Sequence, residues 1–334
     1  MRIGLIGAGA VADFHVAAAR AIDGASITAV CDIDEKAAER AAATAPRATA
    51  FTDYRAMYAS GLIDGVVVNT PHALHLPMVT EAARAGLHVL VEKPMATTLE
   101  DCDAMMAACV EADVALAVGH IQHFMPDKLA ARDLIETAEL GDVVLIRDYR
   151  STDYRPGSRS GWFFSPQMAG GGALINIGGH CLDRSLWFGG GRAVEVFAST
   201  VNRFDSAVET DGNIAMRLDN GVGVSISVIS DPPLRADSLL VVCERGVIVA
   251  DPRAGTSVQV DGKRRVVREP RPDDIQSAFT AQMADFVAVA NGAEPAVPLE
   301  HARHVVELVL ASYRAAEIGG AVQLEGAAVG AAER

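Results

Sequence analysis

The sequence has little of what nucleic-acid-binding, membrane-spanning or disulfide-stabilised proteins need. Its 334 residues include 29 lysines and arginines against 43 aspartates and glutamates, so the formal net charge is −14. Nucleic acids and anionic membranes are bound through basic surfaces, and neither is an expected partner. No apolar run approaches the ~18 residues of a transmembrane helix, and the N-terminus does not resemble a signal peptide. The five cysteines are scattered without C-x-x-C spacing, which favours a reducing compartment, so we expect a cytoplasmic protein.

The first third of the sequence contains a regular alternation of short apolar segments and alanine-rich segments. The apolar segments, which we expect to form strands, are residues 2–7, 26–32, 65–71, 88–94 and 115–120. The segments with helical spacing between them are residues 11–21, 35–45, 73–85 and 98–112. This alternation is typical of right-handed βαβ units, and uninterrupted apolar strands are typical of parallel sheets covered on both faces. It predicts a doubly wound Rossmann domain over residues 1–122.

The rest of the sequence has a different pattern, in which strand-like segments follow one another directly. We expect strands at residues 143–150, 193–204, 212–219, 222–230, 238–243 and 246–250. The expected helices are residues 126–138, a stretch near 171–188, and residues 274–291 and 299–318. The turns "DNG" and "ERG" join several strands as hairpins. The pattern predicts an α+β domain over residues 123–324 with an open, largely antiparallel sheet, followed by a flexible tail at residues 325–334.

A glycine-rich turn follows the first expected strand. The letters "GAGAVA" at residues 7–12 have the G-x-G-x-x-A pattern of dinucleotide-binding turns, and they lie between a strand and a helix as that pattern requires. Gly7 allows the tight turn, and Gly9 lets the backbone approach a pyrophosphate at the start of the helix. We therefore assign Gly7, Gly9, Ala10 and Val11 to cofactor binding.

An acidic residue at the end of the second expected strand supports the dinucleotide. A carboxylate at Asp32 is positioned to accept hydrogen bonds from the adenosine ribose and to repel a 2′-phosphate. A glycine turn without any nucleotide is the alternative, and Asp32 argues against it. The sequence therefore predicts NAD as the cofactor, in preference to NADP.

Four segments together resemble a known family. They are the glycine turn, "VVVNTPHALH" (66–75), "VEKP" (91–94) and "GGGALINIGGHCLD" (170–183), in this order. The sequence resembles the Gfo/Idh/MocA oxidoreductases, and the likeness extends from the first residue through the last helices. The resemblance implies a Rossmann domain followed by an α/β domain with an open sheet. It also implies an NAD(P) cofactor, a sugar, sugar derivative or cyclitol as substrate, and a homodimer or homotetramer.

The "VEKP" segment ends an expected strand with two opposite charges and a proline. Ligands of open parallel sheets bind at the carboxyl ends of strands, so Lys93 is expected beside the cofactor. The resemblance implies that Lys93 contacts the reacting oxygen, where a cation stabilises developing negative charge, and that the Lys93–Pro94 bond is cis. Glu92 either pairs with a cation or contacts the cofactor. For Lys93 the alternative is a salt bridge at a strand end, which stabilises little.

Two further turns carry cofactor candidates. The resemblance implies that Thr70 and Pro71 contact the cofactor, and His75 lies in the same turn. Gln122 follows the last expected strand of the first domain. At the next position the family often has an arginine, and this chain has His123 there. A cofactor contact by Gln122 and a merely polar strand end remain equally open.

A polar stripe follows the three glycines of the second domain. Asn176, His180 and Asp183 are four and three residues apart, so they share one face of the expected helix. In the resembling family this histidine exchanges the substrate proton, and an ordinary imidazole pKa of about 6.5 suits that role. A buried histidine satisfied by Asp183 is the alternative. The family usually has aspartate where this chain has Asn176, and an amide orients a hydroxyl but does not carry its proton.

The loop at residues 150–164, "RSTDYRPGSRSGWFF", carries Arg150, Arg155 and Arg159. A solvated loop is the favoured interpretation. The alternative is a substrate lid, in which an arginine binds an acidic sugar and Trp162 packs on a sugar face or on the nicotinamide.

Three H-x-x-H pairs occur, at residues 72/75, 120/123 and 301/304. No further ligand completes a set at metal-binding spacing, so no metal site is predicted.

Together these features predict an NAD-dependent oxidoreductase that moves a hydride between nicotinamide and a secondary alcohol or ketone of a sugar or cyclitol. His180 exchanges the hydroxyl proton, Lys93 polarises the oxygen, and Asn176 orients the substrate, which Trp162 also contacts. One alternative is a hydrolase or lyase that uses NAD as a resident redox catalyst, and another is a non-catalytic sugar sensor. We expect the uncovered sheet face of the second domain to be the oligomer interface.

Overall fold

The computed structural model describes residues 1–233 and 235–324, and these form two compact units. The first unit contains residues 1–125 and 273–306, and the second contains residues 126–272 and the described residues from 307 onward. The expected α/β class is confirmed, with a parallel Rossmann-type sheet and a mixed, mostly antiparallel sheet. The predicted flexible tail at residues 325–334 lies outside the described residues.

The first unit is built on a six-stranded parallel sheet of order β3-β2-β1-β4-β5-β6. Its strands are β1 (Arg2–Ile6), β2 (Ser26–Cys31), β3 (Thr49–Phe51), β4 (Gly65–Val68), β5 (His88–Glu92) and β6 (Leu116–Gly119). Its helices are α1 (Ala12–Arg20), α2 (Glu35–Thr44), α3 (Tyr54–Ala59), η1 (His72–Leu74), α4 (His75–Arg84), α5 (Leu99–Glu111), η2 (Ile121–Phe124) and α9 (Asp274–Ala290). Strands β2 and β3 lie on one side of β1, and the chain then crosses to the other side of β1 to form β4. Dinucleotides bind at such a switch point.

Residues 273–306 belong to the first unit, whereas the sequence prediction assigned them to the second domain. Helix α9 packs against α1, and the ring of Phe279 stacks on that of Phe14 with centroids 4.9 Å apart. The buried core of this unit combines Phe279, Met283 and Phe286 with the strand residues Ile3 and Leu5. A contact between helices more than 250 positions apart leaves no local pattern in the sequence.

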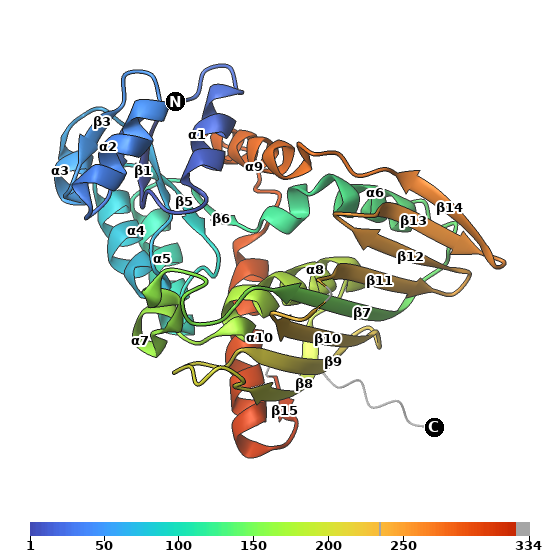
Figure 1. Cartoon of the computed structure of the whole chain (residues 1–334). Helices are drawn as coiled ribbons and strands as arrows, with labels where there is room; N and C mark the ends of the chain where they lie inside the picture. Colours follow the sequence, from blue (N-terminus) through green and yellow to red (C-terminus); the bar gives the residue numbers. More distant parts are fainter. Residues whose placement is uncertain (234, 325–334) are drawn as a thin grey trace. The chain divides into compact units, whose positions relative to one another are not determined.

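The second unit is built on a nine-stranded sheet of order β14-β13-β12-β11-β7-β10-β9-β8-β15 (Figure 1). Its strands are β7 (Val143–Thr152), β8 (Ala193–Val201), β9 (Asp211–Leu218), β10 (Gly223–Ser230), β11 (Asp237–Cys243), β12 (Gly246–Asp251), β13 (Gly255–Val260), β14 (Lys263–Arg268) and β15 (Val322–Gln323). Only β7 and β10 pair in parallel among these described strands. Its helices are α6 (Pro126–Glu136), η3 (Gly161–Phe164), α7 (Pro166–Ala169), the π-helix η4 (Leu174–Gly178) and α8 (Gly179–Gly189). Helix α10 (Leu299–Ile318) contains the boundary between the two units.

Buried charges fasten α8 to its sheet. Arg184 on α8 has no exposed surface and binds Asp148 of β7 in a bidentate pair, with two N–O distances of 2.6 Å. Its Nη1 lies 2.7 Å from Asp237 of β11. Burial alone would raise the pKa of Asp237, but the positive charges of Arg150 and Arg184 hold that pKa below its usual range. The helix that carries His180 is therefore tied to two strands by one side chain.

We expect Arg184→Met to lower the free energy of unfolding of the second unit by about 3–5 kcal/mol, because it leaves the buried carboxylate of Asp148 without its cation and removes one of the two cations beside Asp237. The measurement is the denaturant midpoint of the second unit. Arg314→Met is the matched control, since Arg314 forms a surface pair with Glu317 and its loss is expected to cost at most ~1 kcal/mol. Equal midpoint shifts in the two variants would contradict the assignment.

Among the described helices, none has both the length and the apolar composition needed to cross a bilayer. The five cysteines are all buried and unbridged. Burial raises the pKa of Cys31 to about 11 and that of Cys102 to about 12, which makes both thiols poor nucleophiles near neutral pH.

Candidate functional site

The glycine turn after β1 packs closely against the residue that follows β4. Gly7 has a φ of +92°, and a Cβ there would lie 2.1 Å from the carbonyl oxygen of Asn69. The amide of Asn69 donates to the Gly7 carbonyl at 3.1 Å, which holds the turn against the end of β4. At Gly9 a Cβ would meet no atom within 4 Å, so packing does not require this glycine and the space beside it is open. The next residue, Ala10, is exposed just before α1 begins.

Asp32, which follows β2, binds the backbone of the glycine turn. One of its carboxylate oxygens accepts the backbone N–H of Ala8 at 2.8 Å, and the other accepts that of Asp34 at 2.9 Å. The carboxylate is therefore fixed at the end of β2, directly beside the glycine turn. An exposed helix start next to a fixed acidic acceptor fits the pyrophosphate and ribose of a dinucleotide.

The turn after β4 is held by a buried histidine. His75 has no exposed surface, and its Nε2 lies 3.0 Å from the Thr70 carbonyl oxygen while its Nδ1 lies 3.1 Å from that of Pro94. Burial lowers the pKa of His75, although backbone hydrogen bonds oppose this shift. His75 thus joins the turn after β4, which contains Thr70 and Pro71, to the turn after β5.

Lys93 follows the end of β5 directly after Glu92, which pairs with a buried histidine. The Lys93–Pro94 bond is cis, as expected. Glu92 lies 2.9 Å from Nε2 of His15, a fully buried residue of α1. Burial would raise the pKa of Glu92, but the hydrogen bond from His15 and the charges of His15 and Lys93 lower it below its usual range. A carboxylate and an ammonium therefore stand at adjacent positions, and the carboxylate is anchored to the helix that begins at the glycine turn.

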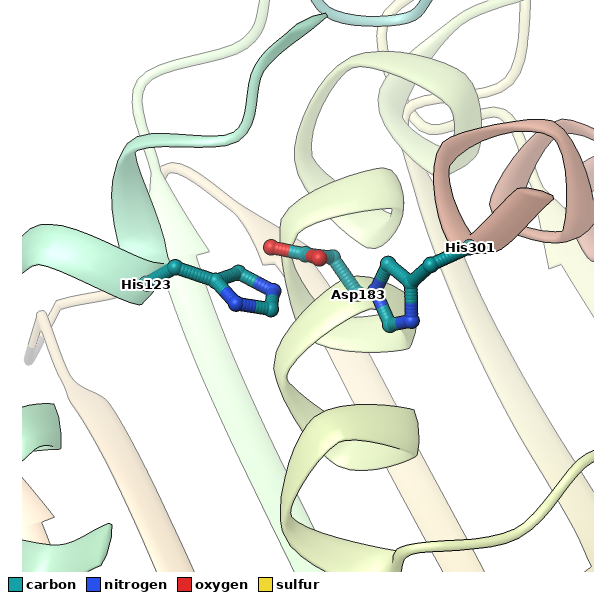
Figure 2. Close-up of side chains that lie close together, drawn as sticks. All are labelled: His123, Asp183 and His301. Atoms are coloured by element: carbon teal, nitrogen blue, oxygen red, sulfur yellow. The ribbon is translucent and has the colours of Figure 1, made fainter. Parts of the chain in front are cut away.

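Several polar side chains lie after the end of β6, where the sequence did not decide between a cofactor contact and a merely polar strand end. Gln122 and His123 are buried on η2. Figure 2 shows His123 and His301, two residues of the first unit, whose rings meet edge to face with centroids 5.2 Å apart. His301 also meets His120, at 6.2 Å. Gln122 therefore lies at the same sheet edge as Gly7, Asp32 and Lys93, because all follow the carboxyl ends of parallel strands.

In the second unit, Asn176 is fixed by a tyrosine. Its Nδ2 donates to the Tyr154 hydroxyl at 3.0 Å and lies 3.3 Å from the Gly172 carbonyl oxygen. The Tyr154 hydroxyl donates in turn to the Phe163 carbonyl at 2.7 Å. Because the Gly172 carbonyl only accepts, and the Tyr154 hydroxyl donates its proton to Phe163, the amide NH₂ must point toward the Gly172 oxygen and the Tyr154 hydroxyl oxygen. An aspartate at position 176 would place an acceptor opposite these oxygens, so the surroundings suit the amide.

The start of the helical segment that carries Asn176 is capped from far along the chain. Glu209 accepts the backbone N–H groups of Gly172 and Leu174 at 2.9 and 2.8 Å, and the hydroxyl of Tyr313 at 2.8 Å. Burial raises the pKa of Glu209 even though these hydrogen bonds oppose the shift. Two of the three glycines make room for these contacts, since a Cβ on Gly171 would lie 2.0 Å from the Tyr313 hydroxyl oxygen and one on Gly172 would lie 2.0 Å from the Glu209 carbonyl oxygen.

His180 lies one residue after the start of α8 and is partly exposed, and Asp183, three residues later on the same helix, is fully buried. Trp162 on η3 stacks on Phe163, with ring centroids 3.8 Å apart. Asn176 and Trp162 are therefore connected through Phe163 and Tyr154. Lys93 and the cofactor candidates belong to the first unit, whereas His180, Asn176 and Trp162 belong to the second.

The fold and the dinucleotide turn define an oxidoreductase that uses a nicotinamide dinucleotide. Residues 1–120 match the family model described as an oxidoreductase family with an NAD-binding Rossmann fold, and residues 129–249 match the GFO/IDH/MocA C-terminal domain. The chain belongs to the Gfo/Idh/MocA oxidoreductase family, as the sequence predicted.

Three relatives illustrate the range of the family. The chain is 32% identical to 1-carboxy-3-chloro-3,4-dihydroxycyclo hexa-1,5-diene dehydrogenase of Comamonas testosteroni over 68% of its own length, but it spans only 57% of that protein. It is 28% identical to D-xylose 1-dehydrogenase (NADP(+)) 2 of Haloferax volcanii over 97% of this chain and all of that one. The solved WlbA dehydrogenase of Bordetella pertussis, in complex with NADH and UDP-GlcNAcA, is 26% identical with a TM-score of 0.85, covering 97% of both chains.

Proposed function

We propose that this oxidoreductase acts on a secondary alcohol or ketone of a sugar, a sugar derivative or a cyclitol. The observation that carries the proposal is the end of β5, where Lys93 follows a carboxylate anchored to the helix of the dinucleotide turn. The relatives support the substrate class, since the Haloferax protein is named for a sugar.

We assign each residue a separate task. The nicotinamide supplies or accepts the hydride when the dinucleotide is bound. Lys93 stabilises negative charge on the reacting oxygen. His180 takes or returns the hydroxyl proton, and Asn176 orients the substrate as a hydrogen-bonding group without carrying a proton. Trp162 is assigned to the substrate because its loop is joined to Asn176 through Tyr154.

The first unit binds the cofactor in this proposal. The backbone of Gly7, Gly9, Ala10 and Val11 would hold the pyrophosphate. Thr70, Pro71, Glu92 and Gln122 would contact the remainder of the dinucleotide. His75 contributes through the turns that it joins.

The proposed cofactor is NAD, and Asp32 is the residue that selects it. We expect Asp32→Ser to weaken NAD binding by about 10- to 100-fold, because a charged hydrogen bond to the ribose is lost, and to narrow the preference against NADP. Calorimetric titration of both dinucleotides measures the ratio. Asp34→Asn is the control, since Asp34 caps α2 by accepting the Lys36 N–H, a role that asparagine keeps. Tighter binding of NADP than NAD by the unaltered protein would overturn the assignment.

Net NADH formation tests the reaction class. We expect absorbance in the NADH band to rise when the protein and added NAD meet one member of a panel of polyols, aldoses, sugar acids and inositols. A hydrolase or lyase with resident NAD converts its substrate without net reduction of the added dinucleotide. A sensor binds a sugar and converts nothing. Either result replaces the proposed function.

The outward face of the second sheet is proposed as the interface of a homodimer or homotetramer. The buried positions of β7 face α8, and Leu145 and Tyr149 on its other face are 38% and 36% exposed. Phe197 and Val201 of β8 are 46% and 51% exposed. Exposed apolar area of this kind is typical of protein interfaces. Light scattering measures the mass of the particle in solution, which distinguishes a monomer from a dimer or a tetramer.

A reducing, cytoplasmic location is proposed from the five unbridged cysteines.

A further inference from the structure

The arginines around the loop between β7 and η3 differ in whether a carboxylate forms an ion pair with them. Arg155 lies 3.1 Å from a carboxylate oxygen of Asp153 and 3.0 Å from one of Asp231. Arg150 lies 3.4 Å from Asp237. In a chain of net charge −14, such pairing of arginine with carboxylates is the expected state.

Arg159 is the exception in this loop. Its Nε donates to the Asp153 backbone carbonyl at 3.0 Å, and its Nη2 donates to the Thr152 hydroxyl at 2.9 Å. Both acceptors are uncharged. Within residues 1–233 and 235–324, no carboxylate forms an ion pair with Arg159, and its Nη1 donates to no group.

The guanidinium is nevertheless fixed in place. It lies over the ring of Tyr154 at 5.3 Å and over that of Phe163 at 5.4 Å from the centroids. Burial lowers the pKa of Arg159 and the positive charge of Arg150 adds to this shift, while interactions with Tyr154 and with the charge of Asp153 oppose it. An arginine remains charged under these conditions. It is therefore a partly desolvated, immobilised cation, and a second anionic partner would stabilise it.

Arg159 is also adjacent to a residue that we assign to the substrate. The Tyr154 ring beneath the guanidinium carries the hydroxyl that accepts the Asn176 amide at 3.0 Å. One side chain thus separates the cation from Asn176. The other loop arginine, Arg155, is exposed and has two acidic partners of its own.

We propose that Arg159 is a specificity-determining residue that binds a carboxylate of the substrate, so that the substrate is a sugar acid or a related polyhydroxy carboxylate. This inference rests on the proposed function. One arginine matches the single charge and the planar geometry of a carboxylate. A phosphate monoester carries about −1.5 to −2 charges and needs more than one cation, which makes a sugar phosphate the poorer match.

The test is calorimetric titration of matched sugars into the NAD-loaded protein at constant ionic strength. The probes are D-glucuronate against D-glucose and D-galacturonate against D-galactose, with D-glucose 6-phosphate as the third anion. We expect at least one acid to bind about 10- to 100-fold more tightly than its neutral partner, as a charge-assisted hydrogen-bonded pair would give. Arg159→Gln removes that ratio, Arg159→Lys keeps part of it, and Arg155→Gln leaves it unchanged.

Several results would overturn the proposal. They are equal binding of acid and neutral sugar, no measurable binding of either acid, tighter binding of the phosphate, and a ratio that survives in Arg159→Gln or disappears equally in Arg155→Gln. A merely structural Arg159 would weaken acid and neutral sugar alike, so the ratio separates the two roles. The NADH panel reports on the proposed function independently, because it measures turnover rather than the preference for charge.

Discussion

Replacement of Lys93 with methionine is expected to lower kcat by about 10²- to 10³-fold, the usual loss when one preorganised group that stabilises charge on oxygen is removed. Methionine keeps much of the length of the side chain and removes its charge. The dinucleotide turn, Asp32 and the pair of His15 with Glu92 remain in place, so NAD affinity is expected to change by only a few fold. The measurements are steady-state turnover on the substrate found in the NADH panel and calorimetric titration of NAD.

Lys36→Met is the matched control for this experiment. Lys36 is an exposed lysine at the start of α2 in the same unit, and its replacement removes the same charge from the protein. Turnover by Lys93→Met within a few fold of the unaltered protein would remove Lys93 from the reaction. A parallel loss of NAD affinity and turnover would reassign it to cofactor binding.

Replacement of His180 with asparagine is expected to lower kcat/KM by about 10²- to 10⁴-fold, the range found for general acid–base groups. Asparagine keeps hydrogen-bonding capacity and exchanges no proton. In the direction of alcohol oxidation the neutral imidazole accepts a proton, so kcat/KM of the unaltered protein should fall toward acidic pH as the imidazole becomes protonated. The variant should lack this dependence.

NAD affinity is the internal control for His180→Asn, because every cofactor residue proposed above belongs to the first unit. A variant that is slow but keeps the acidic limb of the pH profile would move the proton transfer to another group. Asn176→Ala should then differ from His180→Asn, since it removes an orienting amide and is expected to raise KM more than it changes the pH profile.

The parts of the fold set by local pattern could be predicted from the sequence. Helix α10 begins and ends where its apolar spacing indicates, and the glycine turn, Asp32 and Lys93 each follow a strand that reads as an apolar run. Short elements such as β3 and β15 were missed because two or three residues carry no periodicity. The strand β14 was missed because the basic segment 263–268 does not alternate, and its hairpin partner β13 was missed with it.

The parts that depend on distant contacts could not be predicted. His15 meets Glu92 across 77 positions, and Tyr313 meets Glu209 across 104. Tyr154 supports Asn176 from a loop that reads only as polar and glycine-rich, although a tyrosine 22 positions before the asparagine was visible in the sequence. The return of residues 273–306 to the first unit is of the same kind. In each case a buried polar group requires a partner, and the sequence does not name it.

The fate of the nicotinamide hydride tests the central claim most directly. NADH carrying deuterium at nicotinamide C4 is mixed with the ketone formed from the active substrate, and the product is analysed by mass spectrometry. The account predicts that deuterium appears on the product carbon in step with the NAD formed, and that Lys93→Met slows this transfer by about 10²- to 10³-fold. Product that forms without deuterium while the labelled dinucleotide is retained would contradict it.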